Sequence, residues 1–175
     1  FEKYVRNNIW ATFNLIEAVK DSQSLKMFIN TATSSVYGAH ATDPEDASPK
    51  PTSYYGVTKL AAEQLVLSYF RDKDFPACSI RPFSVYGERE RPEQVYPKVI
   101  HSMLDPDYKF PLFEGSKDHL RSYTYVGDIV DGYVSILDNL DKCLGEIFNF
   151  GLDEAITTGE AIKTLERAAG LTAKF

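Results

Sequence analysis

The chain has 175 residues, of which 43% are hydrophobic and 13% aromatic, and these fractions favour one folded domain with a buried core over a disordered chain. The net charge of -6 argues against non-specific nucleic-acid binding, which depends on clustered positive charge, and no apolar run approaches the roughly 20 residues that span a membrane. Cys78 and Cys143 lie far apart and match no metal-ligand spacing, so we expect reduced, buried thiols, no metal site and a cytoplasmic location.

The first half of the chain alternates between amphipathic helices and short apolar runs. Apolar residues recur at helical spacing from Val5 to Ile16, whereas the run KMFINTA is typical of a strand buried in a parallel sheet. Thr52 or Ser53 is placed to cap the second helix. The predicted elements of this half are a helix over 2–20, a strand over 26–32, a loop over 38–53, a helix from Tyr55 to about Lys73, and a strand over 76–82.

The second half begins with the polar loop GERERP and continues the alternation, with Asp128 placed to cap a helix. Its predicted elements are a helix over 93–104, a strand over 121–126, a helix over 127–139, a strand over 146–151, and a helix over 158–169. Such alternation predicts right-handed βαβ units, so we expect an α/β fold with a Rossmann-like, doubly wound parallel sheet. Ligands of these sheets bind at the carboxyl ends of the strands, where TATSS and RPFSVYG lie.

The stretch SYYGVTKLAAEQL, residues 53–65, places two adjacent tyrosines ahead of a lysine. On a helix, at about 100° per residue, Tyr55 and Lys59 are i and i+4 and lie on one face. Tyr54 projects into an apolar stripe that we expect to face the core. The stripe consists of Val57, Leu60, Ala61 and Leu65. The geometry therefore pairs Tyr55, rather than Tyr54, with Lys59 on a separate and more polar face.

This pair suits the removal of a proton from an alcohol. A tyrosine hydroxyl normally has a pKa near 10, and a neighbouring ammonium lowers that pKa because it stabilises the phenolate. A Ser or Thr hydroxyl could hold the substrate alcohol beside the phenolate while another group accepts a hydride. The spacing Y-x-x-x-K arises often by chance, but TATSSVYG upstream and RPFSVYG downstream strengthen the interpretation.

Five motifs in a fixed order carry a resemblance to a known family: NNIWATFNLIEAV, TATSSVYG, YYGVTK, RPFSVYG and RSYTYVGD. Over essentially the whole chain they resemble the extended short-chain dehydrogenase/reductase family, and within it the NAD-dependent nucleotide-sugar epimerases and dehydratases. The resemblance implies that Tyr55 is the catalytic base, that Lys59 lowers the pKa of Tyr55 and holds the nicotinamide ribose, and that Thr33 orients the sugar hydroxyl. It also implies NAD as the cofactor, with NADP as the alternative, and a nucleotide sugar as the substrate.

Further cofactor contacts follow from the same resemblance. Asn7 or Asn8 matches an asparagine region that touches the cofactor, and of the two we assign Asn7. Phe83 lies in the segment after the second predicted strand and matches a residue that meets the nicotinamide. The resemblance therefore predicts that Asn7, Tyr55, Lys59 and Phe83 bind the cofactor.

The resemblance also predicts substrate contacts. Ser84 lies in the segment that meets the sugar phosphate, although many relatives have Asn at this position. Arg121 matches an arginine that grips the diphosphate, for which a bidentate guanidinium is well suited. Arg91, and with it Arg89, can also reach the diphosphate from the loop GERERP, if that loop is not simply solvated. Together with Thr33, these residues form the predicted substrate site.

One departure from the family is the missing glycine-rich fingerprint, since none of the ten glycines falls into G-x-x-G-x-x-G or G-x-G-x-x-G. The chain also starts at Phe1 within a predicted helix. We therefore expect a fragment of a longer enzyme that binds NAD poorly and is inactive alone. Residues 1–87 are expected to form the later half of the dinucleotide-binding Rossmann domain. Residues 88–175 are expected to form a small, mixed α/β substrate-binding region, parts of which return to the Rossmann sheet.

A second departure lies between Thr33 and VYG, where Ser34 and Ser35 stand. Relatives that eliminate water usually carry Asp-Glu there, and relatives that decarboxylate usually carry Glu just before VYG, whereas small neutral residues resemble the 4-epimerases. We therefore expect a homodimeric 4-epimerase of a UDP-hexose or UDP-hexuronate, acting through a transient 4-keto intermediate. The alternatives are a dehydratase or reductase of the same family, or a non-catalytic binding domain that has no need to retain Thr33, Tyr55 and Lys59 together.

Overall fold

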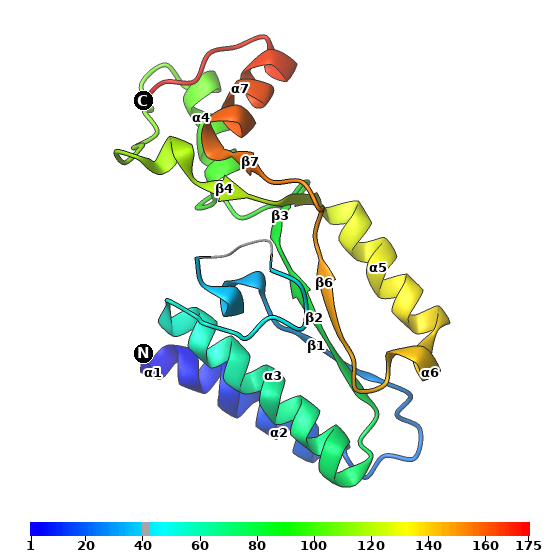
Figure 1. Ribbon diagram of the computed structural model, residues 1–175. Coiled ribbons are helices and arrows are strands. Elements are labelled where there is room, and N and C mark those ends of the chain that lie inside the picture. Colours follow the sequence, from blue (N-terminus) through cyan, green and yellow to red (C-terminus); the bar gives the residue numbers. More distant parts are fainter. Residues whose placement is uncertain (40–42) are drawn as a thin grey trace.

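The structure is a computed structural model that describes residues 1–39 and 43–175; the predicted loop over 38–53 includes 40–42, which lie outside the described residues (Figure 1). A sheet of three parallel strands forms the larger part, in the order β1-β2-β6. Its strands are β1 (Phe28–Thr31), β2 (Ala77–Pro82) and β6 (Ile147–Phe150). All three strands occur where apolar runs predicted them, and their parallel pairing confirms the predicted α/β fold.

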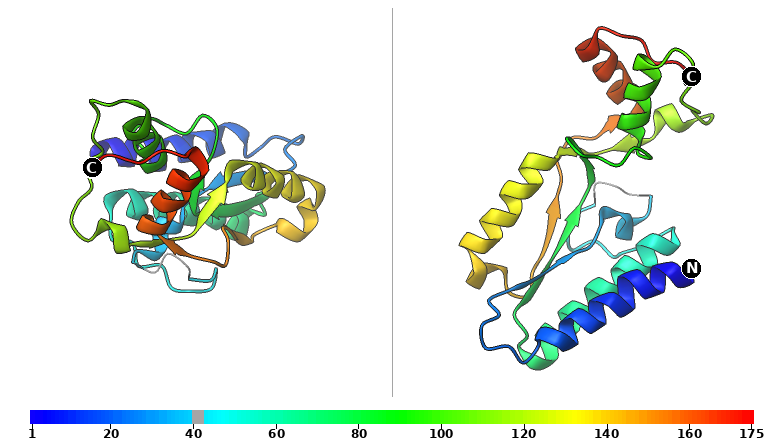
Figure 2. Two further views of the ribbon diagram at one scale, coloured as in Figure 1. Left: turned by 90° about the horizontal axis from the view of Figure 1, so that it is seen from above. Right: turned by 180° about the vertical axis from the view of Figure 1, so that it is seen from behind.

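Helices cover both faces of this sheet (Figure 1 and Figure 2). The helix predicted over 2–20 is present as α1 (Glu2–Tyr4), the π-helical η1 (Val5–Trp10) and α2 (Ala11–Val19). This stretch lies beside α3 (Tyr54–Lys73) on one face, whereas α5 (Val126–Asp138) and α6 (Leu140–Cys143) lie on the other. Among the described residues, no helix is both long and apolar enough to cross a bilayer.

Side chains of β2 alternate between the two helical layers, as the pleat of a strand requires. Ala77 packs with Ile16 and Val66 in the core beneath α2 and α3. Cys78 and Ile80 pack with a second core beneath α5, which contains Ile136 and Cys143. The same alternation turns Ser79 and Arg81 toward α3, and this direction matters for the site described below.

Both helix caps that the sequence suggested are settled by the structure. The Ser53 hydroxyl accepts a hydrogen bond from the backbone N–H of Gly56 at 3.0 Å and is the N-cap of α3. Asp128 is not a cap, because α5 already begins at Val126 after Tyr125. It lies instead in the first turn, where a carboxylate interacts favourably with the positive end of the helix dipole.

The smaller part of the structure holds a separate core built from α4 (Val95–Leu104), α7 (Thr158–Ala169) and the chain around them. Its strand pairs are β3 (Ser84–Tyr86) with β5 (Tyr123–Tyr125), and β4 (Leu120–Arg121) with β7 (Ile156–Thr157). One short helix, η3 (Ser116–Asp118), precedes β4.

The strand predicted over 121–126 is in fact two strands, because its halves pair with different partners. The chain divides at Ser122, whose hydroxyl donates to the Leu152 carbonyl at 2.8 Å and accepts from the Leu152 N–H at 3.0 Å. This anchor lets β4 pair with β7 while β5 pairs with β3. Arg121 is therefore placed where the chain passes from one strand pair to the other.

Candidate active site

A cleft of about 520 Å³ lies where β1 and β2 end and the smaller part begins. It is lined by Thr31, Ala32, Thr33, Tyr55, Pro82, Phe83, Ser84, Val85, Glu90, Arg91, Gln94, Val95, Tyr96, Arg121 and Tyr123. Six residues that the sequence predicted are thus brought to one cavity: Thr33, Tyr55, Phe83, Ser84, Arg91 and Arg121. The carboxyl ends of parallel strands are the usual ligand site of such sheets.

Tyr55 and Lys59 lie in the first turns of α3 and face the carboxyl end of β1. Tyr55 lines the cleft and is 39% exposed. Lys59 is not a lining residue, but its ammonium donates a hydrogen bond to the Thr31 carbonyl at the end of β1. Burial lowers the pKa of Lys59, and the nearby Glu63 carboxylate opposes this shift. The pair lies on one helix face, as the spacing predicted.

The predicted apolar stripe of α3 is wrong in two respects. Tyr54 is 67% exposed and packs edge-on against the Phe1 ring, and Val57 is 43% exposed. The buried positions of the helix are instead Gly56, Thr58, Ala62, Glu63, Val66 and Leu67. The face with Tyr55 and Lys59 is therefore continuous with the sheet-facing side of α3. The charged Glu63 can occupy this side because it forms a buried ion pair with Arg81 on β2.

Thr33 is held at the start of the short helical turn η2 (Ser34–Tyr37), directly after β1. Its hydroxyl caps the turn by accepting from the Ser35 N–H at 3.2 Å and donates to the Ser35 hydroxyl at 3.3 Å. Thr33 is 8% exposed and lines the cleft. A hydroxyl held in this way can present its oxygen to a substrate alcohol at a fixed position.

Phe83, Ser84, Arg91 and Arg121 form the far wall of the cleft, on the side of the smaller part. Ser84 begins β3, and its N–H donates to the Ser122 carbonyl at 3.0 Å, which joins this wall to Arg121. Two guanidinium groups in one cavity can hold a diphosphate, since they offer several charge-assisted donors. Arg89 does not line the cleft.

The structure places the two candidate asparagines in different surroundings. Asn7 is exposed and lines a different surface pocket together with Glu2, Lys3 and Arg6. Asn8 instead points to α3, where its amide donates to the Thr58 hydroxyl at 2.9 Å, next to Lys59 in the chain. The π-helical segment η1 carries both residues, and π-helical turns occur frequently at functional sites.

Glu90, Gln94, Tyr96 and Tyr123 also line the cleft, and sequence reasoning did not find them. The rings of Tyr96 and Tyr123 lie 5.0 Å apart at 33°, and burial raises the pKa of Tyr96. Burial also raises the pKa of the Glu90 carboxyl. The sequence carried one signal for this wall. The segment VYGERERPEQVYP contains aromatic residues on both sides of its charged part, which is more typical of a packed wall than of a freely solvated loop.

Comparison with known proteins gives consistent similarities. The sequence profile of the NAD dependent epimerase/dehydratase family matches residues 2–151. The chain is 33% identical over 171 residues to an uncharacterized UDP-glucose epimerase, YtcB, of Bacillus subtilis, covering 97% of this chain and 53% of that protein. It is 30% identical over 176 residues to the dTDP-D-glucose 4,6-dehydratase of Dictyostelium discoideum, covering 93% of this chain and 39% of that protein.

Among solved structures, the fold is similar to that of UDP-glucuronic acid 4-epimerase from Bacillus cereus in complex with UDP-glucuronic acid and NAD. The TM-score is 0.89 and the identity 37%, and the match covers 98% of this chain and 54% of that one. This likeness agrees with the expectation of a Rossmann-like fold. The chain spans about half the length of this epimerase and of the Bacillus subtilis relative, and less of the dehydratase.

Proposed function

The chain belongs to the NAD dependent epimerase/dehydratase family, and from this premise we propose that it acts as a nucleotide-sugar 4-epimerase on a UDP-hexose or a UDP-hexuronic acid. One observation carries the proposal: Thr33 and Tyr55 line the same cleft as Arg91 and Arg121, with the Lys59 ammonium fixed one helical turn beyond Tyr55. A base, a hydroxyl that orients an alcohol and a site for a diphosphate are the parts that this reaction needs.

In the proposed mechanism, Tyr55 removes the proton from the sugar 4-hydroxyl while Thr33 holds that hydroxyl in place. Lys59 follows Tyr55 by one helical turn on α3, and the Thr31 carbonyl holds its ammonium in place. Arg91 and Arg121 hold the diphosphate, so the sugar can turn over as a flat 4-keto intermediate without leaving the cleft. Tyr55 then returns the proton to the 4-oxygen on the other face of the sugar.

The residues of the chain fit the nicotinamide end of NAD, which we propose as the cofactor, with NADP as the alternative. When bound, NAD supplies reversible hydride exchange at the sugar 4-carbon. Lys59 lies at the carboxyl end of β1, where it can hold a ribose hydroxyl, and Phe83 lines the cleft that begins there. For the asparagine contact we now favour Asn8 over Asn7, because Asn8 bonds to α3 next to Lys59.

An epimerase is favoured over a dehydratase because Thr33 is followed by Ser34 and Ser35, which cannot supply a carboxylate. Elimination of water needs an acid and a base in addition to the tyrosine. One observation keeps the dehydratase as a second candidate: of the described residues that line the cleft, Glu90 is the one acid, and burial raises the pKa of its carboxyl. A group that stays protonated to higher pH could act as such an acid.

The architecture supports two regions with different binding roles, and we include them in the proposal. Residues 1–87 would form the later half of the dinucleotide-binding domain, and 88–175 a substrate-binding region from which α5 and β6 return to the main sheet. We also propose a cytoplasmic homodimer that acts in carbohydrate metabolism. The exposed apolar side chains of Trp10, Leu15 and Val57 on the helical layer support association.

The test is to incubate the full-length protein with UDP-glucose, UDP-glucuronate and dTDP-glucose, and to follow the products by chromatography and mass spectrometry. We expect a product of unchanged mass and shifted retention from a UDP-sugar. Because the cofactor is oxidised and reduced within one cycle, no free NADH should accumulate. Failure to produce any epimer from the three substrates, with NAD bound, would contradict the proposal.

A further inference from the structure

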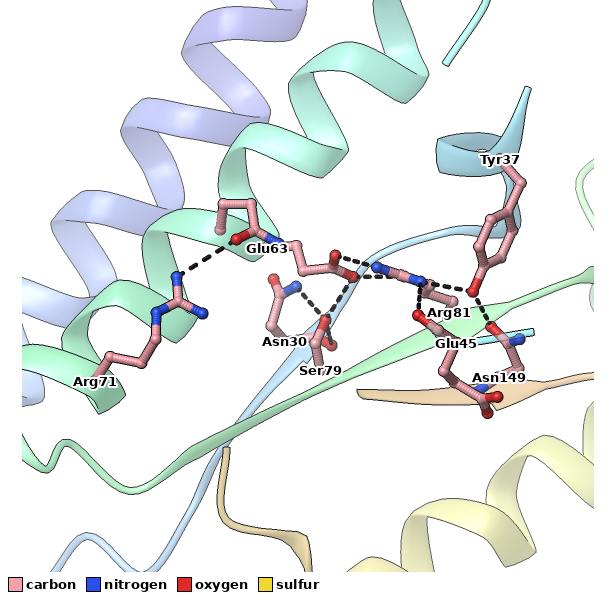
Figure 3. A network of polar contacts seen from close by, with 9 residues as sticks. Asn30, Tyr37, Glu45, Glu63, Arg71, Ser79, Arg81 and Asn149 are labelled. Carbon is pink, nitrogen blue, oxygen red and sulfur yellow. Dashed lines mark hydrogen bonds and ion pairs between the residues drawn. The ribbon is translucent and has the colours of Figure 1, made fainter. Parts of the chain in front are cut away.

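A buried ion pair lies beneath the catalytic face of α3. Arg81 on β2 and Glu63 on α3 are 1% and 0% exposed, and Figure 3 shows the guanidinium directed at the carboxylate. The Arg81 Nε donates to Glu63 Oε2 at 2.9 Å, and Nη2 donates to Oε1 at 2.7 Å. Removing charges from water is costly unless pairing and further hydrogen bonds compensate for it. The rest of the guanidinium must therefore also find acceptors.

Tyr37 supplies one of these acceptors. The Arg81 Nη1 donates to the Tyr37 hydroxyl at 2.6 Å, and the hydroxyl donates in turn to Asn149 Oδ1 on β6 at 2.9 Å (Figure 3). The guanidinium also lies 4.9 Å from the centre of the Tyr37 ring. Tyr37 is 1% exposed, so its hydroxyl is fixed both as a donor and as an acceptor in a dry environment. Its role therefore exceeds simple packing.

The segment before α3 joins the same network. The Glu45 carbonyl accepts from Arg81 Nη1 at 3.3 Å, and the Glu45 carboxylate accepts from the Asn149 N–H at 2.7 Å. The Asn149 amide donates to the Asp43 carbonyl at 3.0 Å. Strands β2 and β6, helix α3 and the two segments on either side of 40–42 therefore meet at Arg81 and Tyr37.

The position of Tyr37 in the chain connects this network to the cleft. Tyr37 is the last residue of η2, and Thr33 caps the first turn of η2. At the other end, the Ala32 N–H donates to the Ile80 carbonyl at 2.7 Å and extends the pairing of β1 with β2. Thr33 therefore lies in a short span that is anchored on both sides. Releasing the Tyr37 anchor would leave the strand side, the hydrogen bond from the Lys50 N–H to the Val36 carbonyl, and the close contact of Gly56 with Ser35.

We propose that Tyr37 is a positioning residue of the active site, whose hydroxyl fixes η2 through Arg81 and Asn149 and thereby holds Thr33 at the place where it meets the sugar 4-hydroxyl. This proposal rests on the proposed function, since it requires that Thr33 orient a substrate. Its physical basis is that reaction rates depend steeply on geometry, and a displacement of about 1 Å caused by a distant change can cost about 10²-fold in rate.

The test is a double-mutant cycle in the full-length enzyme with Tyr37→Phe, Thr33→Val and the double variant. Tyr37→Phe removes only the hydroxyl, and we expect it to lower kcat about 10- to 100-fold with a smaller change in KM. In the Thr33→Val background, Tyr37→Phe should cost little more, because the group through which it acts is already gone. Independent effects would multiply instead.

The matched control is Tyr69→Phe, which also removes a tyrosine hydroxyl from a hydrogen bond, here one of 2.7 Å to Glu17 between α2 and α3. It should lower the melting temperature without lowering kcat, when all rates are measured well below the melting temperatures. If Tyr37→Phe does not fold, Asn149→Ala takes its place in the cycle, since it removes the acceptor of the Tyr37 hydroxyl.

The outcomes separate the two proposals. Losses that multiply in the double variant, an unchanged kcat in Tyr37→Phe, or an unchanged kcat in Thr33→Val would each overturn the positioning role while the wild-type enzyme still epimerises its substrate. A wild-type enzyme that forms no epimer would overturn the proposed function itself. Losses that do not multiply, together with a normal kcat in Tyr69→Phe, would establish the positioning role.

Discussion

Gly56 and Ser35 approach each other so closely that a Cβ on Gly56 would lie 2.6 Å from the Ser35 carbonyl oxygen. Gly56 directly follows Tyr55 in α3, and Ser35 lies in η2, whose cap is Thr33. The contact therefore fixes the distance between the two elements that carry the candidate base and the candidate hydroxyl. Any side chain at position 56 must push them apart, because the opposing atom belongs to the backbone.

We predict that Gly56→Ala lowers both stability and turnover. Alanine normally stabilises a helix interior relative to glycine by about 0.8–1.0 kcal/mol, but forcing atoms into a packed site costs about 1–3 kcal/mol. The net effect should be a lower melting temperature and a kcat reduced by about tenfold or more through displacement of η2. Gly159→Ala in α7 is the control, since its Cβ would come no closer than 3.3 Å to another atom. Equal behaviour of the two variants in thermal melts and rate assays would contradict this account.

We predict that Tyr55→Phe in the full-length enzyme abolishes most activity and leaves the fold intact. Only a hydroxyl at the cleft is removed, and the loss of a general base typically costs about 10²–10⁴-fold. Tyr54→Phe is a close control, because it removes the hydroxyl of the adjacent tyrosine. Tyr54 is 67% exposed and packs against Phe1. Circular dichroism checks the fold and a coupled epimerase assay the rate. Unchanged turnover in Tyr55→Phe would mean that another residue is the base.

Much of the cleft could be predicted from the sequence, because it is assembled at the ends of strands. Apolar runs located β1 and β2, and the resemblance to the epimerase/dehydratase family supplied Thr33, Phe83 and Ser84 from the motifs directly after them. Helical spacing alone was enough to pair Tyr55 with Lys59. The strands and the pair depend on local sequence, and one general rule of parallel sheets places the motifs at the same edge.

The buried face of α3 could not be predicted in the same way. Periodicity identifies apolar positions, whereas Glu63 is fully buried because Arg81 neutralises it from a strand that is distant in sequence. The same limit concealed Glu90, since a charged loop residue lines a cavity only if the neighbouring wall folds over it. The choice between Asn7 and Asn8 depends on η1, a π-helical segment whose phase differs from that of a regular helix and which periodicity does not predict.

We predict that Lys59→Met lowers kcat and removes the alkaline limb of the pH–rate profile. The variant lacks the titrating ammonium that the proposed mechanism places one helical turn beyond Tyr55. In the wild type, activity should fall at high pH as Lys59 loses its proton, and because burial lowers the pKa of Lys59, this alkaline limb lies below the usual range of a lysine. Lys73→Met, at the far end of α3, should keep the wild-type profile. Profiles of kcat that coincide for all three proteins would contradict a role for Lys59.

The last prediction concerns Glu90 and separates an epimerase from a dehydratase. If the enzyme is a 4-epimerase, Glu90 takes no part in the proton path, and Glu90→Gln should change turnover by no more than about twofold, the size expected for an energetic effect of about 0.5 kcal/mol. The wild type and the variant should then both form a product of unchanged mass.

If the wild type instead forms a product about 18 Da lighter, by loss of water, Glu90 is the candidate acid, because burial raises the pKa of its carboxyl and it lines the cleft. Glu90→Gln should then abolish the lighter product, whereas Glu88→Gln should not, since the Glu88 carboxylate is exposed and accepts from the Tyr125 hydroxyl at 2.9 Å outside the cleft. Mass spectrometry of the three proteins with UDP-glucose and dTDP-glucose therefore decides between the two chemistries, and a lighter product in all three would require an acid other than Glu90.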